Sequence, residues 1–109
     1  LYSVFNELGG GYQEKYYRRA VAIGLKKAGL EYQEQVYVPL TFASESIGSY
    51  YLDFLVARSV VLEIKKGDYF APTNIKQVYA YLQSTGLQLG LLANFTPKGV
   101  RVKRIVNVI

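Results

Sequence analysis

The first third of the chain carries apolar residues at helical spacing. Three glycines interrupt the chain at residues 9–11, and apolar side chains then recur every three or four positions over residues 12–28, before Gly29 ends the pattern. The apolar arc of this segment consists of Ala20, Gly24, Tyr17, Ala28, Val21 and Leu25, and the opposite arc carries Lys15, Arg18, Arg19 and Lys26. We predict a helix over residues 12–28 that buries the apolar arc.

After the predicted helix, apolar residues recur at every second position. Apolar residues at positions 36, 38, 40 and 42 predict a strand, and Pro39 predicts that this strand lies near a sheet edge. After a polar loop at residues 43–49, two apolar runs at 51–56 and 60–65 are separated by three residues, which is typical of a β-hairpin. The side chains that share one face of this hairpin, and that we expect in the core, are Leu52, Phe54, Val56, Val60, Leu62 and Ile64.

The rest of the chain predicts one more helix and two more strands. Pro72 suits the first turn of a helix that ends at Gly86. Its apolar stripe consists of Ile75, Val78, Tyr79 and Leu82. Residues 87–95 are apolar enough for a central strand, and residues 100–106 predict a final, basic one. The expected order is α-β-β-β-α-β-β, in the α/β class.

The composition limits the chemistry that the chain can perform. Half of its 109 residues are apolar, which is enough for one core, and we expect a single domain over residues 1–109. The chain has no cysteine and no histidine, which excludes disulfides, thiolate nucleophiles, serine–histidine triads and imidazole-bound metals. Carboxylates must then hold any metal, and they suit a hard ion such as Mg²⁺, with Mn²⁺ as a substitute.

The formal charge of +5 and the pI of ≈ 9.4 favour a polyanionic partner such as nucleic acid. Each lysine or arginine that meets a phosphate releases a counterion. From charge alone, a basic domain that binds no nucleic acid is an equal alternative. No apolar run approaches the roughly 18 residues needed to span a bilayer, and the N-terminus lacks a signal-peptide pattern. We therefore expect a cytoplasmic protein without a membrane partner.

The predicted hairpin places two acids opposite each other. If its loop is residues 57–59, Asp53 faces Glu63, and Lys65 follows on the same face as Glu63 because side chains alternate along a strand. Facing carboxylates destabilise a sheet unless a cation compensates. The pattern therefore indicates a divalent metal beside Lys65. The alternative is that Lys65 alone neutralises both acids on a solvent-exposed face.

Glu14 adds a third acid from the first helix. It lies within the apolar arc, where an ionised carboxylate is costly to bury without a partner. A pair with Arg18, four residues on, is the alternative, but at about 0.2–0.5 kcal/mol it is too small to explain an inward-facing acid. We therefore expect Glu14 to bind the metal directly or through a water molecule.

These residues match what metal-assisted phosphodiester hydrolysis requires. Asp53 and Glu63 would be metal ligands, and the main-chain carbonyl of Ile64 is a natural third ligand. The metal lowers the pKa of a water molecule, and Lys65 positions that water or stabilises the developing negative charge. The pattern thus predicts a Mg²⁺-dependent phosphodiesterase.

The same motifs, in this order, resemble the PD-(D/E)XK, or restriction-endonuclease-like, nuclease superfamily. Asp53, nine intervening residues and then Glu63-Ile64-Lys65 match its D…(D/E)xK signature. Residues 11–17 are similar to the motif that names its GxxExxY branch. The likeness extends over residues 10–107. Leu52 stands where the superfamily name has proline, a position that varies.

The resemblance implies a restriction-endonuclease-like core, in which helices flank a central mixed β-sheet. It also implies magnesium at the two hairpin acids, a catalytic Lys65 and Glu14 as the acid of the first helix. Gln77 and Tyr81 match a glutamine and a tyrosine that face the site in the GxxExxY branch. They are equally consistent with a solvated face opposite the predicted apolar stripe.

Five basic residues are candidates for contacts with nucleic-acid phosphates: Lys66, Lys98, Arg101, Lys103 and Arg104. Lys66 lies on the core side of its strand and would reach outward or touch a phosphate. The other four have no acid among them. They are typical of a phosphate-binding surface or of a charged edge strand that discourages aggregation.

We therefore expect a metal-dependent nuclease, with DNA favoured over RNA as its substrate. The alternatives are a catalytically silent nucleic-acid-binding module of the same fold and a purely structural or protein-interaction domain. The sequence leaves open endonuclease or exonuclease action and the number of metals. A homodimer would suit a two-stranded target.

Overall fold

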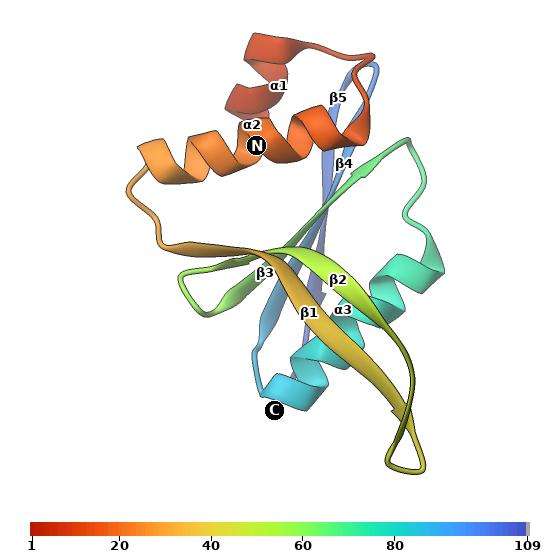
Figure 1. Ribbon diagram of the computed structural model, residues 1–109. Coiled ribbons are helices and arrows are strands. Elements are labelled where there is room, and N and C mark those ends of the chain that lie inside the picture. The colour runs from red at the N-terminus through yellow and green to blue at the C-terminus, as the bar shows by residue number, and fades with distance from the viewer. Residues whose placement is uncertain (109) are drawn as a thin grey trace.

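Five strands form one mixed sheet, and helices cover both of its faces (Figure 1). The computed structural model describes residues 1–108. The elements are α1 (Tyr2–Leu8), α2 (Glu14–Lys27), β1 (Tyr32–Phe42), β2 (Glu45–Val56), β3 (Val60–Lys66), α3 (Pro72–Thr85), β4 (Leu89–Thr96) and β5 (Gly99–Val106). The predicted α/β class is confirmed, and the order gains one helix at its start.

The strands lie in the order β1-β2-β3-β4-β5. β3 and β4 are parallel, and every other neighbouring pair is antiparallel. A parallel pair needs a crossover connection, and α3 supplies it. The mixed sheet with flanking helices is therefore as predicted, and β1, which contains Pro39, is an edge strand.

Each face of the sheet has its own hydrophobic core. The α2-side core consists of Tyr17, Val21, Phe54, Leu62, Ile64, Ala93, Phe95 and Val100. The α3-side core consists of Val36, Val38, Leu52, Val61, Val78, Leu82, Leu92 and Ile105. The prediction that Leu52 shares a face with Phe54 is therefore wrong. Leu52 pairs with Val36 of β1, in a region where the two strands bend towards α3 (Figure 1).

The paired residues 36–52 of β1 and β2 form an arm that projects from the body of the molecule (Figure 1). The predicted loop at residues 43–49 is wrong, because pairing continues to Phe42 and Glu45. The turn is made by Ala43 and Ser44, with φ angles of 52° and 65°. Glycine, asparagine or aspartate normally marks such a turn, and neither position carries one. The sequence therefore gave no signal for it.

The sequence pattern also missed α1. This helix has only 7 residues, which is too few for a helix to be stable by itself. Val4, Phe5 and Leu8 pack against the α2-side core. Tertiary packing therefore stabilises α1. None of the helices within residues 1–108 has the length and apolarity needed to cross a membrane.

Gly90 allows α3 to pack closely against β4. A Cβ atom built at Gly90 would lie 2.5 Å from Cγ1 of Val78, which is fully buried. Because a buried β-branched side chain cannot easily move, we expect Gly90→Ala to lower the free energy of unfolding by about 1–3 kcal/mol. Urea unfolding followed by circular dichroism measures this change.

Gly24→Ala provides the matched control for Gly90→Ala. A Cβ atom at Gly24 meets nothing within 4 Å, and alanine favours a helix interior by about 0.5–1 kcal/mol relative to glycine. Gly24→Ala should therefore leave the protein as stable as wild type or more stable. Equal stabilities for the two variants would contradict the close packing at Gly90.

Candidate active site

Two carboxylates, from Asp53 on β2 and Glu63 on β3, lie side by side in the sheet. The hairpin ladder has the predicted register, and its last regular pair is Phe54 with Leu62. Beyond that pair the acids bridge the strands, because Glu63 Oε1 accepts the N–H of Asp53 at 2.7 Å and Asp53 Oδ2 accepts the N–H of Ile64 at 2.7 Å. Each carboxylate therefore uses one oxygen to hold the hairpin and keeps the other free for a cation.

Two cations face the remaining oxygens. Lys65 Nζ lies 3.7 Å from Glu63 Oε2, and Arg18 Nε lies 3.8 Å from Asp53 Oδ1. Arg18 was predicted on the outer, basic arc of the helix, and this prediction is wrong for its guanidinium group. The long side chain reaches past the first turn of α2 to the buried acid.

Burial and, after it, the adjacent charge of Asp53 raise the pKa of Glu63 to about 7. The hydrogen bond from the Asp53 N–H and the charge of Lys65 act in the opposite direction without cancelling the effect. The pair therefore carries less negative charge near neutral pH than two ordinary carboxylates. Full ionisation of the pair calls for more positive charge than Arg18 and Lys65 supply.

Glu14 lies at the start of α2 and completes the cluster. Its Oε2 lies 3.6 Å from Arg18 Nη1, and its Oε1 lies 3.9 Å from Lys65 Nζ. Within residues 1–108, Oε1 is buried and has no hydrogen-bond partner. The four residues that the sequence analysis brought together, Glu14, Asp53, Glu63 and Lys65, thus lie at one place. The pair with Arg18 that was weighed as an alternative is present as well.

The glycine and tyrosine that flank Glu14 in the GxxExxY motif explain how α2 is positioned. Gly11 has a φ of 90°, which suits glycine in the turn before the helix. The buried Tyr17 stacks on Phe95 of β4 with ring centroids 4.2 Å apart. Its hydroxyl donates a hydrogen bond to the carbonyl of Gly9 at 2.7 Å. Tyr17 thus fixes the start of α2 against the sheet and holds Glu14 over the two strands.

α3 approaches the cluster from the other side. The Tyr50 hydroxyl donates a hydrogen bond to the main-chain carbonyl of Gln77 at 3.0 Å. Its pKa is raised by burial, then by the charge of Glu63 and by Tyr81. Tyr81 packs on the α3-side core, whereas Tyr79, which the predicted stripe included, is exposed. Tyr50 packs against the same core as Tyr81.

Tyr50 is the residue that sequence reasoning missed. Its strand began in the segment that was predicted to be a loop, so no register linked it to Glu63. Alternation along a longer strand would have been the only signal.

The five basic candidates do not form one surface. Arg101 follows Lys65 and Asn94 in register across β3, β4 and β5, and its Nη1 donates to the carbonyl of Asp68 at 3.0 Å. Lys103 lies on the same face of β5 as Arg101. Arg104 points to the opposite face, because side chains alternate along a strand. Lys66, in β3, and Lys98, between β4 and β5, are exposed. Arg101 is therefore the candidate most directly in line with Lys65.

The acidic pair offers donors that fit a hard divalent cation. Asp53 Oδ1 and Glu63 Oε2 make no hydrogen bond to main chain, and Mg²⁺ characteristically takes one or two carboxylates and keeps several waters. Within residues 1–108, however, no group of three or more acid, histidine or cysteine side chains converges enough to hold a metal. Arg18 and Lys65 stand between Glu14 and the pair. Arg18 pairs with both Glu14 and Asp53, and Lys65 with both Glu14 and Glu63.

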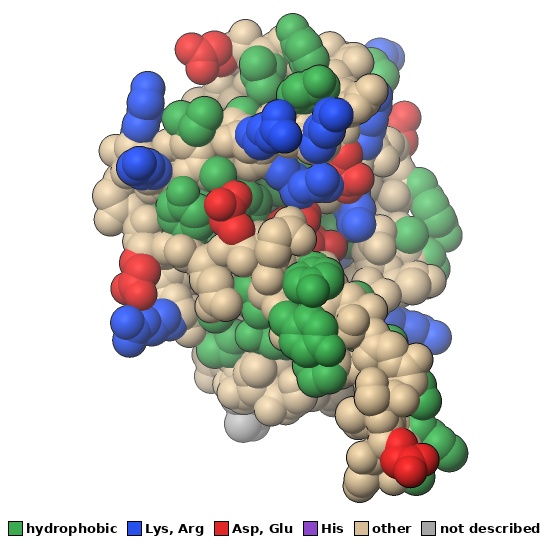
Figure 2. All heavy atoms as spheres, in the orientation of Figure 1, with side chains coloured by type: hydrophobic (Ala, Val, Ile, Leu, Met, Phe, Trp, Pro, Cys, Tyr) green, Lys and Arg blue, Asp and Glu red, His purple; other side chains and the backbone are tan. Residues whose placement is uncertain are grey.

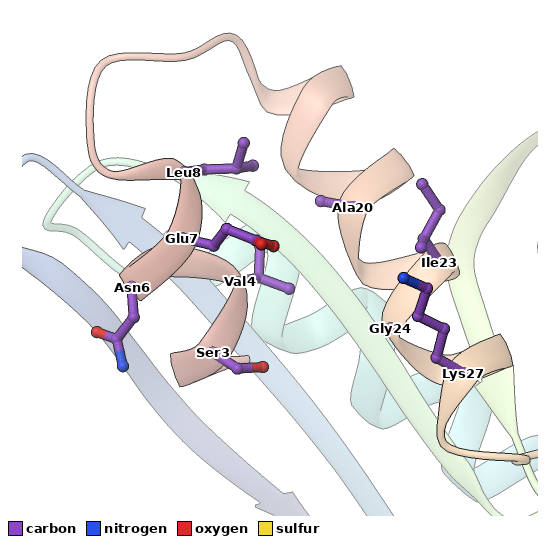
Figure 3. A pocket seen from close by; sticks show the side chains of 9 residues that line it. All are labelled: Ser3, Val4, Asn6, Glu7, Leu8, Ala20, Ile23, Gly24 and Lys27. Carbon is purple, nitrogen blue, oxygen red and sulfur yellow. The ribbon is translucent and has the colours of Figure 1, made fainter.

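A large hollow lies elsewhere, between α1 and α2 (Figure 3). Its volume is about 790 Å³, and its lining consists of Ser3, Val4, Asn6, Glu7, Leu8, Ala20, Ile23, Gly24 and Lys27. None of the residues of the acidic cluster lines it. Its lining is mostly apolar.

A known protein family matches almost the whole chain. The family described as the PD-(D/E)XK nuclease superfamily matches residues 1–105. This chain therefore belongs to the PD-(D/E)XK nuclease superfamily. No curated protein sequence matches the chain significantly.

Three solved structures share the fold. SSO0001 is 19% identical with a TM-score of 0.65, covering 87% of this chain and 50% of its own. The alkaline exonuclease LHK-Exo of Laribacter hongkongensis is 19% identical with a TM-score of 0.59, covering 86% of this chain and 56% of its own. The Holliday junction resolvase Hjc of Archaeoglobus fulgidus is 17% identical with a TM-score of 0.54, covering 84% and 76%. This chain spans about half the length of the first two.

Proposed function

We propose that this chain is a metal-dependent nuclease that hydrolyses phosphodiester bonds, with DNA as its substrate. The observation that carries the proposal is the pairing of Asp53 and Glu63, each with one free oxygen, directly beside Lys65. Superfamily membership and the formal charge of +5 support a nucleic-acid substrate. Two proteins with the same fold are named as an exonuclease and as a Holliday junction resolvase, which favours DNA.

In the proposed mechanism the two acids and Lys65 have different roles. Asp53 and Glu63, with the carbonyl of Ile64, would hold Mg²⁺ or Mn²⁺. When bound, that ion supplies Lewis-acid polarisation of a phosphate oxygen. Glu63 must lose its proton to bind a cation, and its raised pKa makes this step dependent on pH near neutrality. Lys65 stabilises the negative charge that develops on the phosphate oxygens.

Arg18 and Glu14 set the balance of charge around the pair. Arg18 compensates the charge of Asp53, and its guanidinium group would be suited to contact a substrate phosphate beside the pair. Glu14 holds both Arg18 and Lys65 at the edge of the site. Its buried, unpartnered Oε1 is suited to accept a hydrogen bond from a water molecule there.

Asp53→Asn tests the proposal. Asparagine keeps an oxygen for the N–H of Ile64 but loses the charge that a cation requires, so we expect cleavage to fall by about 100-fold or more in Mg²⁺. Wild type and variant are incubated with labelled single-stranded, duplex and branched DNA and with RNA, in Mg²⁺ or Mn²⁺. Glu45→Gln, at the tip of the arm, is the control and should cleave like wild type.

Cleavage by Asp53→Asn at the wild-type rate would contradict the proposed site. If wild type cuts none of these substrates with either metal, yet binds them with an affinity that falls steeply with salt, the chain is a catalytically silent nucleic-acid-binding module.

A further inference from the structure

We propose that the outer surface of α2 binds an unpaired stretch of the substrate strand and stacks one of its bases on Tyr16. We call the surface formed by Tyr12, Lys15, Tyr16 and Arg19 the α2 platform. The proposal rests on the proposed function, because it names the form of nucleic acid that reaches the acidic cluster. It concerns residues other than those that hold the metal or touch the scissile phosphate.

The α2 platform combines an exposed aromatic ring with two cations. Tyr16 is 43% exposed and Tyr12 is 44% exposed, and their rings meet edge to face with centroids 6.4 Å apart. Lys15 Nζ lies 5.2 Å from the centroid of the Tyr16 ring, and Arg19 Cζ lies 6.0 Å from it. Flexible cations around an aromatic ring are the composition that single-stranded nucleic-acid sites use.

An incoming base can replace one of these cations on the ring. Exposed cation–π contacts are weaker than the stacking of a base on an aromatic side chain. The displaced ammonium or guanidinium group stays on its flexible stem and is then free to contact the neighbouring phosphate. One base and one phosphate would thus bind together, without any requirement for a particular base.

The α2 platform continues directly from the acidic cluster around the helix. Arg18 contacts Asp53, and at about 100° per residue Lys15 and Arg19 follow next on the helix surface, with Tyr16 beyond them. Figure 2 shows basic side chains gathered over α2, next to acidic side chains. The helix is about 10 Å wide, a distance that a stacked strand covers in about three nucleotides at roughly 3.4 Å each.

The charge distribution favours one strand over a duplex. A base must leave its partner before it can stack on Tyr16. The arm, residues 36–52, contains no lysine or arginine and carries one acid, Glu45. A duplex broad enough to contact both α2 and the arm would therefore meet no positive charge on the arm to compensate its phosphates. The positive charge of the α2 platform, without a counterpart on the arm, therefore suits one strand better than a duplex.

Equilibrium binding without cleavage tests the α2 platform. A fluorescein-labelled oligo(dT) strand and its duplex with oligo(dA) are titrated with the protein in EDTA, and fluorescence anisotropy is measured. We expect Tyr16→Leu to weaken binding of the single strand by about tenfold or more and binding of the duplex by less than about twofold. Tyr16→Phe, which keeps the ring, should bind the single strand like wild type.

Tyr79→Leu is the matched control, because Tyr79 is also a helical tyrosine of similar exposure, at 38%, and lies on α3. It should leave both affinities unchanged. The double variant Lys15→Ala, Arg19→Ala should weaken single-strand binding and reduce its salt dependence by about two counterions. Photocrosslinking of a 5-iodouracil strand should join it to the peptide that contains Tyr16.

The outcomes separate this inference from the nuclease proposal. If wild type cleaves DNA but Tyr16→Leu binds the single strand as tightly as wild type does, the α2 platform is wrong and the nuclease stands. If wild type cleaves nothing but Tyr16→Leu loses single-strand affinity selectively, the platform stands and the nuclease proposal fails. Equal losses for single strand and duplex, or no single-strand binding by wild type, overturn the platform.

Discussion

Replacing Lys65 by alanine is expected to lower the rate of phosphodiester cleavage by about 100- to 1,000-fold while substrate binding changes little. Lys65 is the cation nearest Glu63, at 3.7 Å, and a preorganised positive charge stabilises the transition state more than the ground state. Single-turnover rates at saturating protein measure the chemical step separately from binding.

Lys66→Ala is the control for Lys65→Ala. Lys66 is the next residue of β3, carries the same charge and is exposed, and alternation points its side chain to the opposite face. Its removal should lower affinity slightly and leave the single-turnover rate within about twofold of wild type. A Lys65→Ala protein that retains the wild-type rate would remove Lys65 from the mechanism.

The second large effect concerns Glu63 and pH. The folded state raises the pKa of Glu63 from 4.5 to about 7, so between these values the folded state holds a proton that the unfolded state has released. The stabilisation from this proton is fully present below pH 4.5 and is lost as pH rises through about 7. The shift corresponds to about 3 kcal/mol at most.

The comparison with Glu63→Gln isolates this contribution. Glutamine keeps an oxygen for the N–H of Asp53 and cannot ionise. We expect the wild-type free energy of unfolding, relative to the variant, to fall by up to about 3 kcal/mol from acidic pH to pH 8 in EDTA. Urea unfolding at a series of pH values measures it. A difference that stays constant or increases with pH would contradict the burial argument.

Adding Mg²⁺ at the alkaline end of this series completes the test. A cation that binds ionised Glu63 in the folded state raises the free energy of unfolding in proportion to the logarithm of its concentration. Wild type should therefore recover stability in Mg²⁺, whereas Glu63→Gln should recover less. Equal responses of the two proteins would show that the ion binds elsewhere.

Much of the architecture could be predicted because it depends on neighbours in the sequence. The helical spacing of apolar residues predicted α2 within two residues at its start and one at its end. The hairpin register followed from its three-residue loop and is confirmed by the pairs from Val56 with Val60 to Phe54 with Leu62. The regular pairing ends there, and Asp53 and Glu63 meet directly beyond it through hydrogen bonds from their carboxylates to the main chain of the facing strand.

The surroundings of the acids were not predictable in the same way. The arm, with its turn at Ala43 and Ser44, has no local glycine signal, and its bend towards α3 brings Tyr50 beside Glu63. Arg18 belongs to the outer arc by its angle, yet its side chain reaches Asp53. The seven residues of α1 form a helix only against the α2-side core.

The sequence by itself determined α2, α3, the hairpin, the two acids that meet on it and the superfamily signature they carry, because periodicity and hairpin register depend on interactions between residues close in the chain. Only the tertiary structure decided which oxygens remain free, how strongly Glu63 holds its proton and where the aromatic and basic side chains of α2 lie relative to the site. Those properties depend on burial and on contacts between residues far apart in the chain, so the pattern of neighbouring residues does not predict them.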